Sequence, residues 1–378
     1  MKNFSDAITV ISFFAIIIMF AVSTVFFQQN VSLREEISLR EEISLREGKE
    51  VNVSVKESVR GFVKDNFPMS DNWRTLYANL LVWTGRERFG NVYLADGRLI
   101  KLCGDRKADT DRNVSLINDF AAAADKPVYV MLAPTAEGIY SAGSSQIVSR
   151  LNQKEQIDDI YLKLDKKIGT IDAYYPLYSA RDEYVYYRTE DLWTSFGAYY
   201  AYAEAIKQMG FQPMTLSNYD QEYAISSFTG SLYEKVMYSG ITPDRINIFR
   251  SKYKSSVERV ELEKNKEVKT AKSVYFRSAL KTDKPTDIYL LGDGYERVSV
   301  YTSAEGAPKL LIIKGSFANT LVPFLTPHYS EITLADPSLI KSCGGKLEDK
   351  VNTDDYDQIL ILYDADSFAH EDSLDILS

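Results

Sequence analysis

Apolar runs of strand length constrain the fold of this chain more than any other feature of its sequence. One is a buried strand, Pro127-Val-Tyr-Val-Met-Leu-Ala133, and three more follow later, Asp287-Ile-Tyr-Leu-Leu291, Leu310-Leu-Ile-Ile313 and Gln358-Ile-Leu-Ile-Leu-Tyr363. Runs without polar alternation are typical of parallel strands that are buried on both faces. Two segments with helical periodicity, Asp111–Ala124 and Asn152–Ile168, alternate with predicted strands along the chain. This alternation predicts an α/β domain with a mostly parallel sheet flanked by helices.

Other elements follow from shorter patterns and from turn residues. We expect a hairpin at Asn91–Ile100 with its turn at Asp96-Gly97, strands at Ile171–Tyr175 and Asp287–Leu291, a helix at Trp193–Met209, and short strands within residues 245–280 that would form a peripheral subdomain.

Composition restricts the classes of function. The chain has 378 residues, of which 45% are apolar, so it can bury one large core or two small ones. Its 44 basic and 53 acidic residues give a net charge of −9, without a long basic block, which argues against a nucleic acid partner. Cys103 and Cys343 have no metal-ligand spacing; two free thiols are the simpler interpretation, and a disulfide is the alternative. No motif for a cofactor or a metal is present.

An uncharged segment near the amino terminus predicts membrane attachment. Ala7 to Phe27 is 21 residues without a charge, which as a helix would span about 31 Å. We favour an uncleaved single-pass anchor; a cleaved signal peptide, with Ala21-Val-Ser23 as its cleavage site, is the alternative. The short tail of residues 1–6 would stay in the cytoplasm. Residues 28–378 would then lie outside the cell membrane.

A hexad repeat follows this segment. Ser32 to Glu47 reads SLREEI-SLREEI-SLRE. Six residues turn a helix by about 600°, so the apolar positions do not form the stripe of a heptad coiled coil. A solvated helix with i,i+4 Glu–Arg pairs and an extended strand with one apolar face both fit the pattern. We interpret residues 28–54 as a stalk, and residues 55–378 as the extracytoplasmic domain.

The strongest candidate for chemistry is a serine that directly follows a predicted strand. After Leu310–Ile313 the chain continues Lys314-Gly315-Ser316 and then enters a stretch that favours a helix. A parallel sheet presents a serine hydroxyl at the carboxyl edge of a strand in this way. Ser316 is therefore the candidate nucleophile.

Two long phrases resemble one family. Residues 187–202, with Glu190-Asp191-Leu192-Trp193, and residues 314–332, around Ser316, resemble the bacterial DHHW proteins. That family groups with SGNH-type, alginate acetyltransferase-like proteins of the cell envelope. The resemblance extends over roughly residues 55–378, including a Phe-Pro turn before a long helix that carries Trp73, Leu76, Leu80 and Leu81. It implies an SGNH-like fold and a role with cell-surface polysaccharide.

The chain departs from the family at most of the positions that carry the chemistry. The resemblance implies that the second His of Asp-His-His-Trp is the base and that the Asp of this motif orients it. In the family an Asp also precedes the serine, and a Gly-Gly-Asn phrase supplies an amide donor. Here these positions read Glu190 for the Asp, Leu192 for the second His, Gly315 for the Asp before the serine, and Gly292-Asp293-Gly294 for the Gly-Gly-Asn phrase. Ser316 alone carries over.

Replacement bases are few. His328 follows Ser316 by twelve residues, about 18 Å along a helix, and His370 lies in the charged C-terminal tail, so neither is expected to activate the serine. Glu190 or Asp191 could act as a base if burial raised its pKa, although a structural carboxylate is the simpler interpretation. Trp193, Tyr199 and Tyr200 are expected in the core.

Three hypotheses of function follow. The first is a catalytically degenerate protein that binds or helps to modify cell-surface polysaccharide, alone or with an envelope protein. The second is an active serine acyl-transfer enzyme, a polysaccharide O-acetyltransferase or acetylesterase, that uses Ser316 with Glu190 or Asp191. The third is a structural anchored envelope protein in which the stalk sets a distance from the membrane.

Overall fold

The computed structural model describes residues 13–15, 18–19, 69–104, 109–141, 152–252 and 257–377. These belong to two compact units, one of residues 1–85 and 236–239 and the other of residues 86–235 and 240–378. Within the predicted membrane segment, residues 13–15 and 18–19 are described and are helical. None of the helices in the described ranges is long and apolar enough to span a bilayer. The rest of that segment and the predicted stalk lie outside the described residues.

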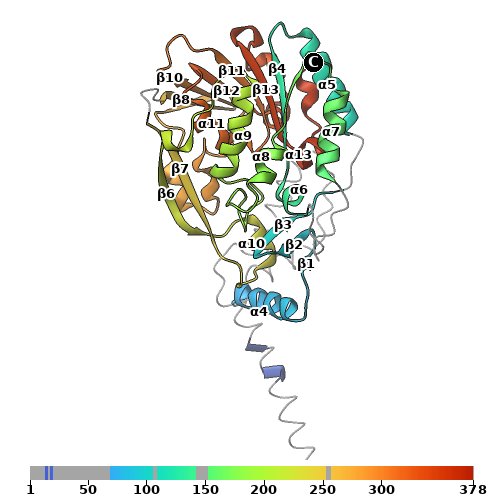
Figure 1. Ribbon diagram of the computed structural model, residues 1–378. Coiled ribbons are helices and arrows are strands. Elements are labelled where there is room, and N and C mark those ends of the chain that lie inside the picture. The colour runs from blue at the N-terminus through green and yellow to red at the C-terminus, as the bar shows by residue number, and fades with distance from the viewer. Residues whose placement is uncertain are drawn as a thin grey trace, which may run out of the picture. The chain divides into compact units, whose positions relative to one another are not determined.

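An eight-stranded mixed sheet forms the larger unit (Figure 1). Its strands, in spatial order, are β5 (Gly169–Ile171), β4 (Val128–Ala133), β13 (Gln358–Asp364), β11 (Lys309–Lys314), β12 (Glu331–Ala335), β10 (Arg297–Thr302), β8 (Val257–Lys264) and β9 (Glu267–Ala271). The first five pair in parallel, and the pairings from β12 to β9 are antiparallel. The predicted parallel sheet is thus confirmed for one half of a mixed sheet.

Two further pieces of sheet belong to this unit. They are a three-stranded piece of β1 (Arg88–Phe89), β2 (Val92–Ala95) and β3 (Arg98–Lys101), and a ribbon of β6 (Tyr219–Phe228) and β7 (Asp244–Ser251). In the predicted hairpin, Asp96 and Gly97 both have positive φ, 48° and 69°. That backbone is the one an Asp-Gly turn of a tight hairpin requires.

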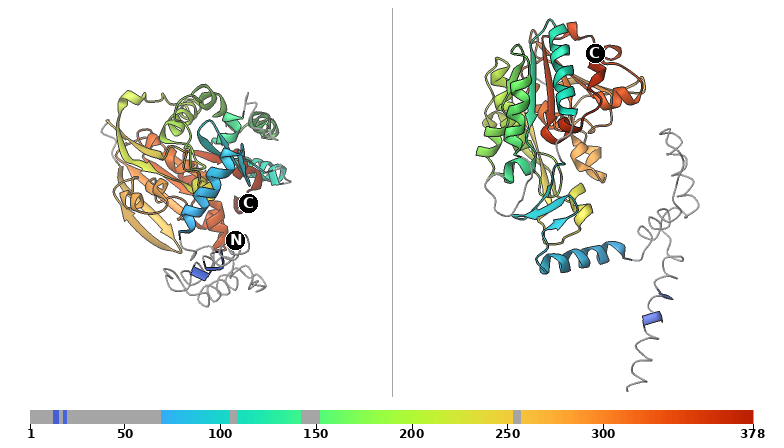
Figure 2. Two further views of the ribbon diagram at one scale, coloured as in Figure 1. Left: turned by 90° about the horizontal axis from the view of Figure 1, so that it is seen from below. Right: turned by 90° about the vertical axis from the view of Figure 1, so that its right-hand side faces the viewer.

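Helices cover both faces of the parallel strands (Figure 2). The helices α9 (Ser195–Gln208) and α11 (Ala318–Leu325) pack on one face, and α5 (Asp109–Ala123) and α7 (Gln153–Lys163) pack on the other. The remaining helices are α6 (Ala136–Tyr140), α8 (Tyr174–Ser179), α10 (Ser231–Val236), α12 (Pro337–Ser342) and α13 (Ala365–His370). Short 3-10 helices are η1 (Leu216–Asn218), η2 (Arg277–Lys281), η3 (Pro285–Ile288), η4 (Leu347–Asp349), η5 (Thr353–Asp355) and η6 (Leu374–Leu377).

Alternate residues of the central strand serve two separate cores. In β11, Leu310 and Ile312 join the core that includes α9 and α11, whereas Leu311 and Ile313 join the core that includes α5 and α7. Successive side chains of a strand point to opposite faces, so burial on both faces requires an uninterrupted apolar run. This is the physical basis of the pattern seen in the sequence.

In the described part of the smaller unit, the main element is the 14-residue helix α4 (Ser70–Trp83). This confirms the helix expected from the family phrase. Ala78 is its buried residue, and its N-cap, Met69, has a positive φ of 55°.

Several predictions about elements were wrong. Asp287–Leu291 is not a strand: η3 ends at Ile288, and Leu290 and Leu291 have positive φ of 55° and 60°. The strand predicted at Ile171–Tyr175 ends at Ile171, because α8 begins at Tyr174. Residues 245–280 do not form a peripheral subdomain, since β8 and β9 extend the main sheet.

The simpler interpretation of the cysteines is confirmed, because Cys103 and Cys343 are both free thiols.

Candidate active site

Ser316 lies at the carboxyl end of β11, between that strand and α11. The neighbouring strands β12 and β13 run parallel to β11 and end at the same edge. The Gly315 N–H donates to the Leu362 carbonyl oxygen at 2.7 Å, so the ladder continues up to the residue before the serine. The turn therefore presents Ser316 at the edge of the sheet, as the sequence predicts.

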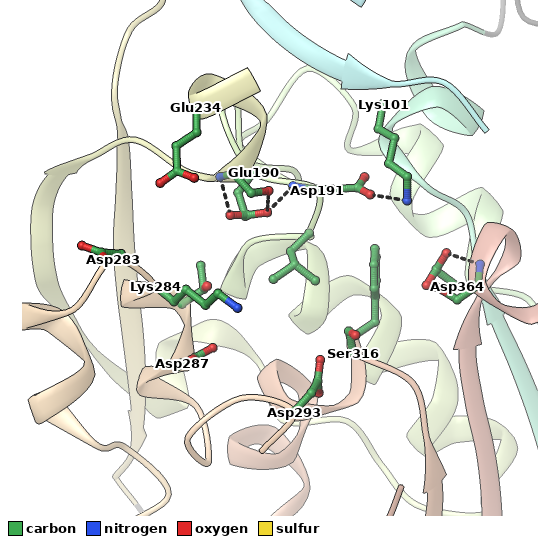
Figure 3. A pocket seen from close by; sticks show the side chains of 15 residues that line it. Lys101, Glu190, Asp191, Glu234, Asp283, Lys284, Asp287, Asp293, Ser316 and Asp364 are labelled. Atoms are coloured by element: carbon green, nitrogen blue, oxygen red, sulfur yellow. Dashed lines mark hydrogen bonds and ion pairs between the residues drawn. The ribbon is translucent and has the colours of Figure 1, made fainter. Parts of the chain in front are cut away.

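A cavity of about 450 Å³ opens at this edge, a size typical of small-molecule sites. It is lined by Lys101, Glu190, Asp191, Leu192, Ser231, Glu234, Asp283, Lys284, Thr286, Asp287, Asp293, Ser316, Phe317, Asp364 and Ser367. Ser316 and the residues Glu190, Asp191 and Leu192, which are far apart in sequence, thus face one cavity (Figure 3). The two phrases on which the family resemblance rests converge in space.

The buried indole of Trp193 links these two phrases. Its Nε1–H donates to the carbonyl oxygen of Phe317, the residue after Ser316, at 3.0 Å, and its ring lies 4.9 Å from the Phe317 ring. Trp193 is fully buried, as expected from the sequence. Tyr199 and Tyr200 are partly buried and pack against the same core. The tryptophan of the motif therefore supports the backbone of the serine turn.

A carboxylate lies next to the Ser316 hydroxyl. It belongs to Asp293, which stands beside Ser316 in Figure 3. Asp293 accepts from Asn319 Nδ2 at 2.9 Å and pairs with Lys314 Nζ at 2.5 Å. The Lys314 side chain is 2% exposed, and its Nζ also lies 3.4 Å from Asp336. A buried ammonium group therefore holds Asp293 next to the serine.

The electrostatics of Asp293 make it a weak base. Burial alone would raise its pKa, but the charge of Lys314 and the hydrogen bonds from Lys314, Ser316 and Asn319 hold the pKa below its usual range. A carboxylate with a low pKa stays ionised near neutral pH and takes up a proton reluctantly.

Glu190 serves a structural role at the start of α10. Its carboxylate accepts from the Ser231 N–H at 2.8 Å, the Ser231 hydroxyl at 2.6 Å and the Asp191 N–H at 2.9 Å. Gly230 lies so close that a Cβ there would be 2.6 Å from Glu190 Cβ. Within the described residues no hydrogen bond joins Glu190 to Ser316.

Asp191 is paired with a lysine from the hairpin. Its carboxylate lies 2.9 Å from Lys101 Nζ, which also contacts Asp366 at 3.1 Å. Burial raises the pKa of Asp191 to about 6, against the opposing charge of Lys101. For Lys101, burial disfavours the charged form, but the two carboxylates together raise its pKa. No hydrogen bond to Ser316 is found for Asp191 within the ranges that the structure describes.

Neither histidine lines the cavity as far as the structure describes it. His328 Nε2 bonds to the Tyr202 hydroxyl at 2.7 Å, and burial lowers the pKa of this imidazole to about 4. His370 is exposed, and its Nδ1 contacts the backbone carbonyl of Asp366 at 2.8 Å. In the described ranges no cluster of three or more His, Cys, Asp or Glu has a geometry that would hold a metal ion.

Sequence reasoning missed much of the lining of this site, including Lys101, Glu234 and Asp364, and the supporting role of Lys314. Lys101 and Lys314 carry no motif of their own, and Asp364, a buried cavity residue, reads as the end of an apolar strand. Asp364 caps α13 by accepting from the N–H groups of Asp366 and Ser367, and burial raises its pKa. A signal was available for Asp364, because strand β13 ends beside β11 and a carboxylate at its end must lie at the same edge.

The chain thus forms an α/β protein, with a mixed sheet flanked by helices and a serine at the carboxyl edge of the parallel strands. A model of the DHHW protein family matches residues 29–334, and the chain belongs to this family. A search of curated protein sequences finds no match.

Solved structures agree with this fold. A DHHW family protein from Eubacterium siraeum is 22% identical, with 76% of this chain and 93% of that chain covered and a TM-score of 0.59. Bacillus cereus PatB1, with a sulfonyl adduct, is 15% identical, with 75% and 98% covered and a TM-score of 0.63. At these identities the similarity concerns the fold.

Proposed function

We propose that this chain is a membrane-anchored, extracytoplasmic DHHW protein that binds cell-surface polysaccharide in the cavity at Ser316 without transferring an acyl group. The observation that carries the proposal is the position of Asp293, an ionised carboxylate held by Lys314, beside the Ser316 hydroxyl. Serine needs a base that can accept its proton, and acyl transfer needs donors where the oxyanion develops. A carboxylate of low pKa beside Ser316 supplies neither.

The lining of the cavity suits a polyhydroxyl ligand. Carboxylates are strong hydrogen-bond acceptors, and a sugar presents several hydroxyl donors at once. Asp287 and Glu234 line the cavity from two separate elements, η3 and α10, so they would contact different sides of such a ligand. The anchor at residues 7–27, expected from the sequence, would keep this cavity at the cell surface. The family resemblance supports polysaccharide as the ligand class.

Catalysis is tested with the full-length chain and an aryl acetate. We expect the rate of acetate release by the wild-type protein to equal that of Ser316→Ala, because the hydroxyl is not activated. A turnover that disappears in Ser316→Ala would overturn the proposal. Binding of neutral oligosaccharides, measured by calorimetry, should persist in Ser316→Ala and weaken by about 1–3 kcal/mol in Asp287→Asn or Glu234→Gln, where a charged acceptor is lost.

The raised pKa of Asp191 favours a second candidate function, serine acyl transfer with a divergent base. Asp191 would take the Ser316 proton while the serine oxygen bonds to the acyl carbon and an alcohol leaves. This role requires Asp191 to turn from Lys101 towards Ser316.

The pH profile decides this second candidate. A base must be deprotonated, so kcat/KM should rise with pH through about 6, the pKa of Asp191, and reach a plateau above it. Asp191→Asn should remove both the activity and the pH dependence. A rate that is unchanged in Asp191→Asn would exclude Asp191 as the base.

A further inference from the structure

The helix α4 displays its large apolar side chains and buries a small one. Six apolar residues of this region are 46–84% exposed: Met69, Trp73, Leu76, Tyr77, Leu80 and Trp83. At about 100° per residue they fall within an arc of about 120° on one side of the helix. Ala78, the buried residue of α4, lies on the opposite side. This is the reverse of a surface helix in a water-soluble protein, where the apolar stripe faces the core.

From this stripe we infer that α4 lies flat in a membrane interface, with the stripe in contact with lipid. An apolar face of this size marks a surface that meets a partner. Trp73, Tyr77 and Trp83 have the amphipathic rings that concentrate at the level of lipid headgroups. The helix has 14 residues, about 21 Å, and is therefore too short to cross a hydrocarbon core of about 30 Å.

The charge around the stripe specifies the kind of membrane surface. The stripe itself carries no charge, and next to it Arg74 pairs with Asp71 at 3.3 Å. The charged groups of α4 thus balance each other, so anionic lipids gain little over zwitterionic ones. We expect binding to phosphatidylcholine vesicles that changes little when anionic lipid or salt is added.

The same chain supplies the means to reach a membrane. The uncharged segment at residues 7–27 precedes α4, and residues 28–68 connect the two. A tether of this kind turns a weak interfacial contact into an intramolecular one with a high effective concentration. The stripe would then fix how the chain meets the bilayer, a role that does not depend on the function proposed for the cavity.

The chain contains three tryptophans, which allow a direct test. Trp73 and Trp83 belong to the stripe, and Trp193 is fully buried in the other unit. We would reconstitute the full chain in phosphatidylcholine vesicles that carry a nitroxide quencher near the headgroup. Because two of the three indoles would contact lipid, total emission should fall towards about one third of its unquenched value. In Trp73→Phe/Trp83→Phe, emission from Trp193 should remain nearly unquenched.

A matched control places a tryptophan at another exposed position. Leu162 on α7 is 83% exposed, close to the 84% of Trp83. Leu162→Trp, added to the Trp73→Phe/Trp83→Phe chain, should be quenched by aqueous iodide and not by the lipid nitroxide. All of these changes are at exposed positions, so the fold should persist.

Two outcomes would overturn the inference. If iodide quenches Trp83 in vesicles as strongly as it quenches the Leu162→Trp control, the stripe faces water. If neither iodide nor lipid nitroxide reaches Trp83, protein covers the stripe, either a second copy or another segment of this chain.

Discussion

A carboxylate and an amide at position 293 would present Ser316 with opposite chemistry. The ionised Asp293 carboxylate beside Ser316 offers only hydrogen-bond acceptors and adds negative charge where an oxyanion would form. An amide could donate there instead, and Lys314 would then add positive charge to the same region. Leu192 is the second difference from an active site, because this aliphatic side chain lines the cavity at the position where the family resemblance implies a histidine.

At the residue scale we therefore predict that Asp293→Asn/Leu192→His increases the reactivity of Ser316. A sulfonyl fluoride should label Ser316 in this variant at least about tenfold faster than in the wild type, because one oxyanion donor alone is worth about 100-fold or more in an enzyme. Labelling is measured by mass spectrometry of the intact chain. The same variant with Ser316→Ala should remain unlabelled, and equal rates in wild type and variant would contradict the role of Asp293.

The residues of the two family phrases could be predicted from the sequence, whereas the position of Asp293 beside Ser316 could not. The sequence predicts Ser316 and its cavity neighbours Glu190, Asp191 and Leu192, because two long phrases match one family. The contact between Ser316 and Asp293 depends on a backbone turn with three successive positive φ angles, at Leu290, Leu291 and Gly292. Leucine rarely adopts that region, so local preference predicts a strand and misses the turn.

At the scale of elements, the hairpin of β2 and β3 closes one side of the cavity. The Leu99 N–H donates to the Arg188 carbonyl at 2.8 Å, so β3 docks on the loop that carries the motif. The last residue of β3, Lys101, then bridges that loop and α13 through Asp191 and Asp366. The turn at Asp96-Gly97 predicts the hairpin, but its docking partner depends on tertiary packing that no local pattern encodes.

Lys101→Met should therefore destabilise the larger unit. It leaves Asp191 and Asp366, which are 24% and 11% exposed, without their shared cation, at a cost of about 1–3 kcal/mol. Lys163→Met is the matched control, because its ion pair with Asp111 is exposed and should contribute less than about 1 kcal/mol. Denaturant unfolding measures both variants, and equal losses would show that the Lys101 bridge is not structural.

At the scale of the whole molecule, burial decides which half of the sheet can be predicted. The parallel strands β4, β11 and β13 are buried on both faces, and their uninterrupted apolar runs predict them. In the antiparallel half, β8 reads VERVELEK, with charges at five of its eight positions, and it extends the sheet toward the edge strand β9. The pairing of β8 with β10 is a contact between distant segments, so residues 245–280 look separate in sequence although they continue the sheet.

The glycine before the serine couples two distant positions of the chain. A Cβ on Gly315 would lie 2.9 Å from Cδ1 of Tyr363, a ring that is 1% exposed and cannot easily move. Aspartate at position 315, the residue that the family resemblance leads one to expect, therefore requires a different packing around position 363. Introduced alone, it would create a clash before it could add any chemistry. A designer who wants a carboxylate at this turn must therefore change both positions together, with a smaller side chain at 363.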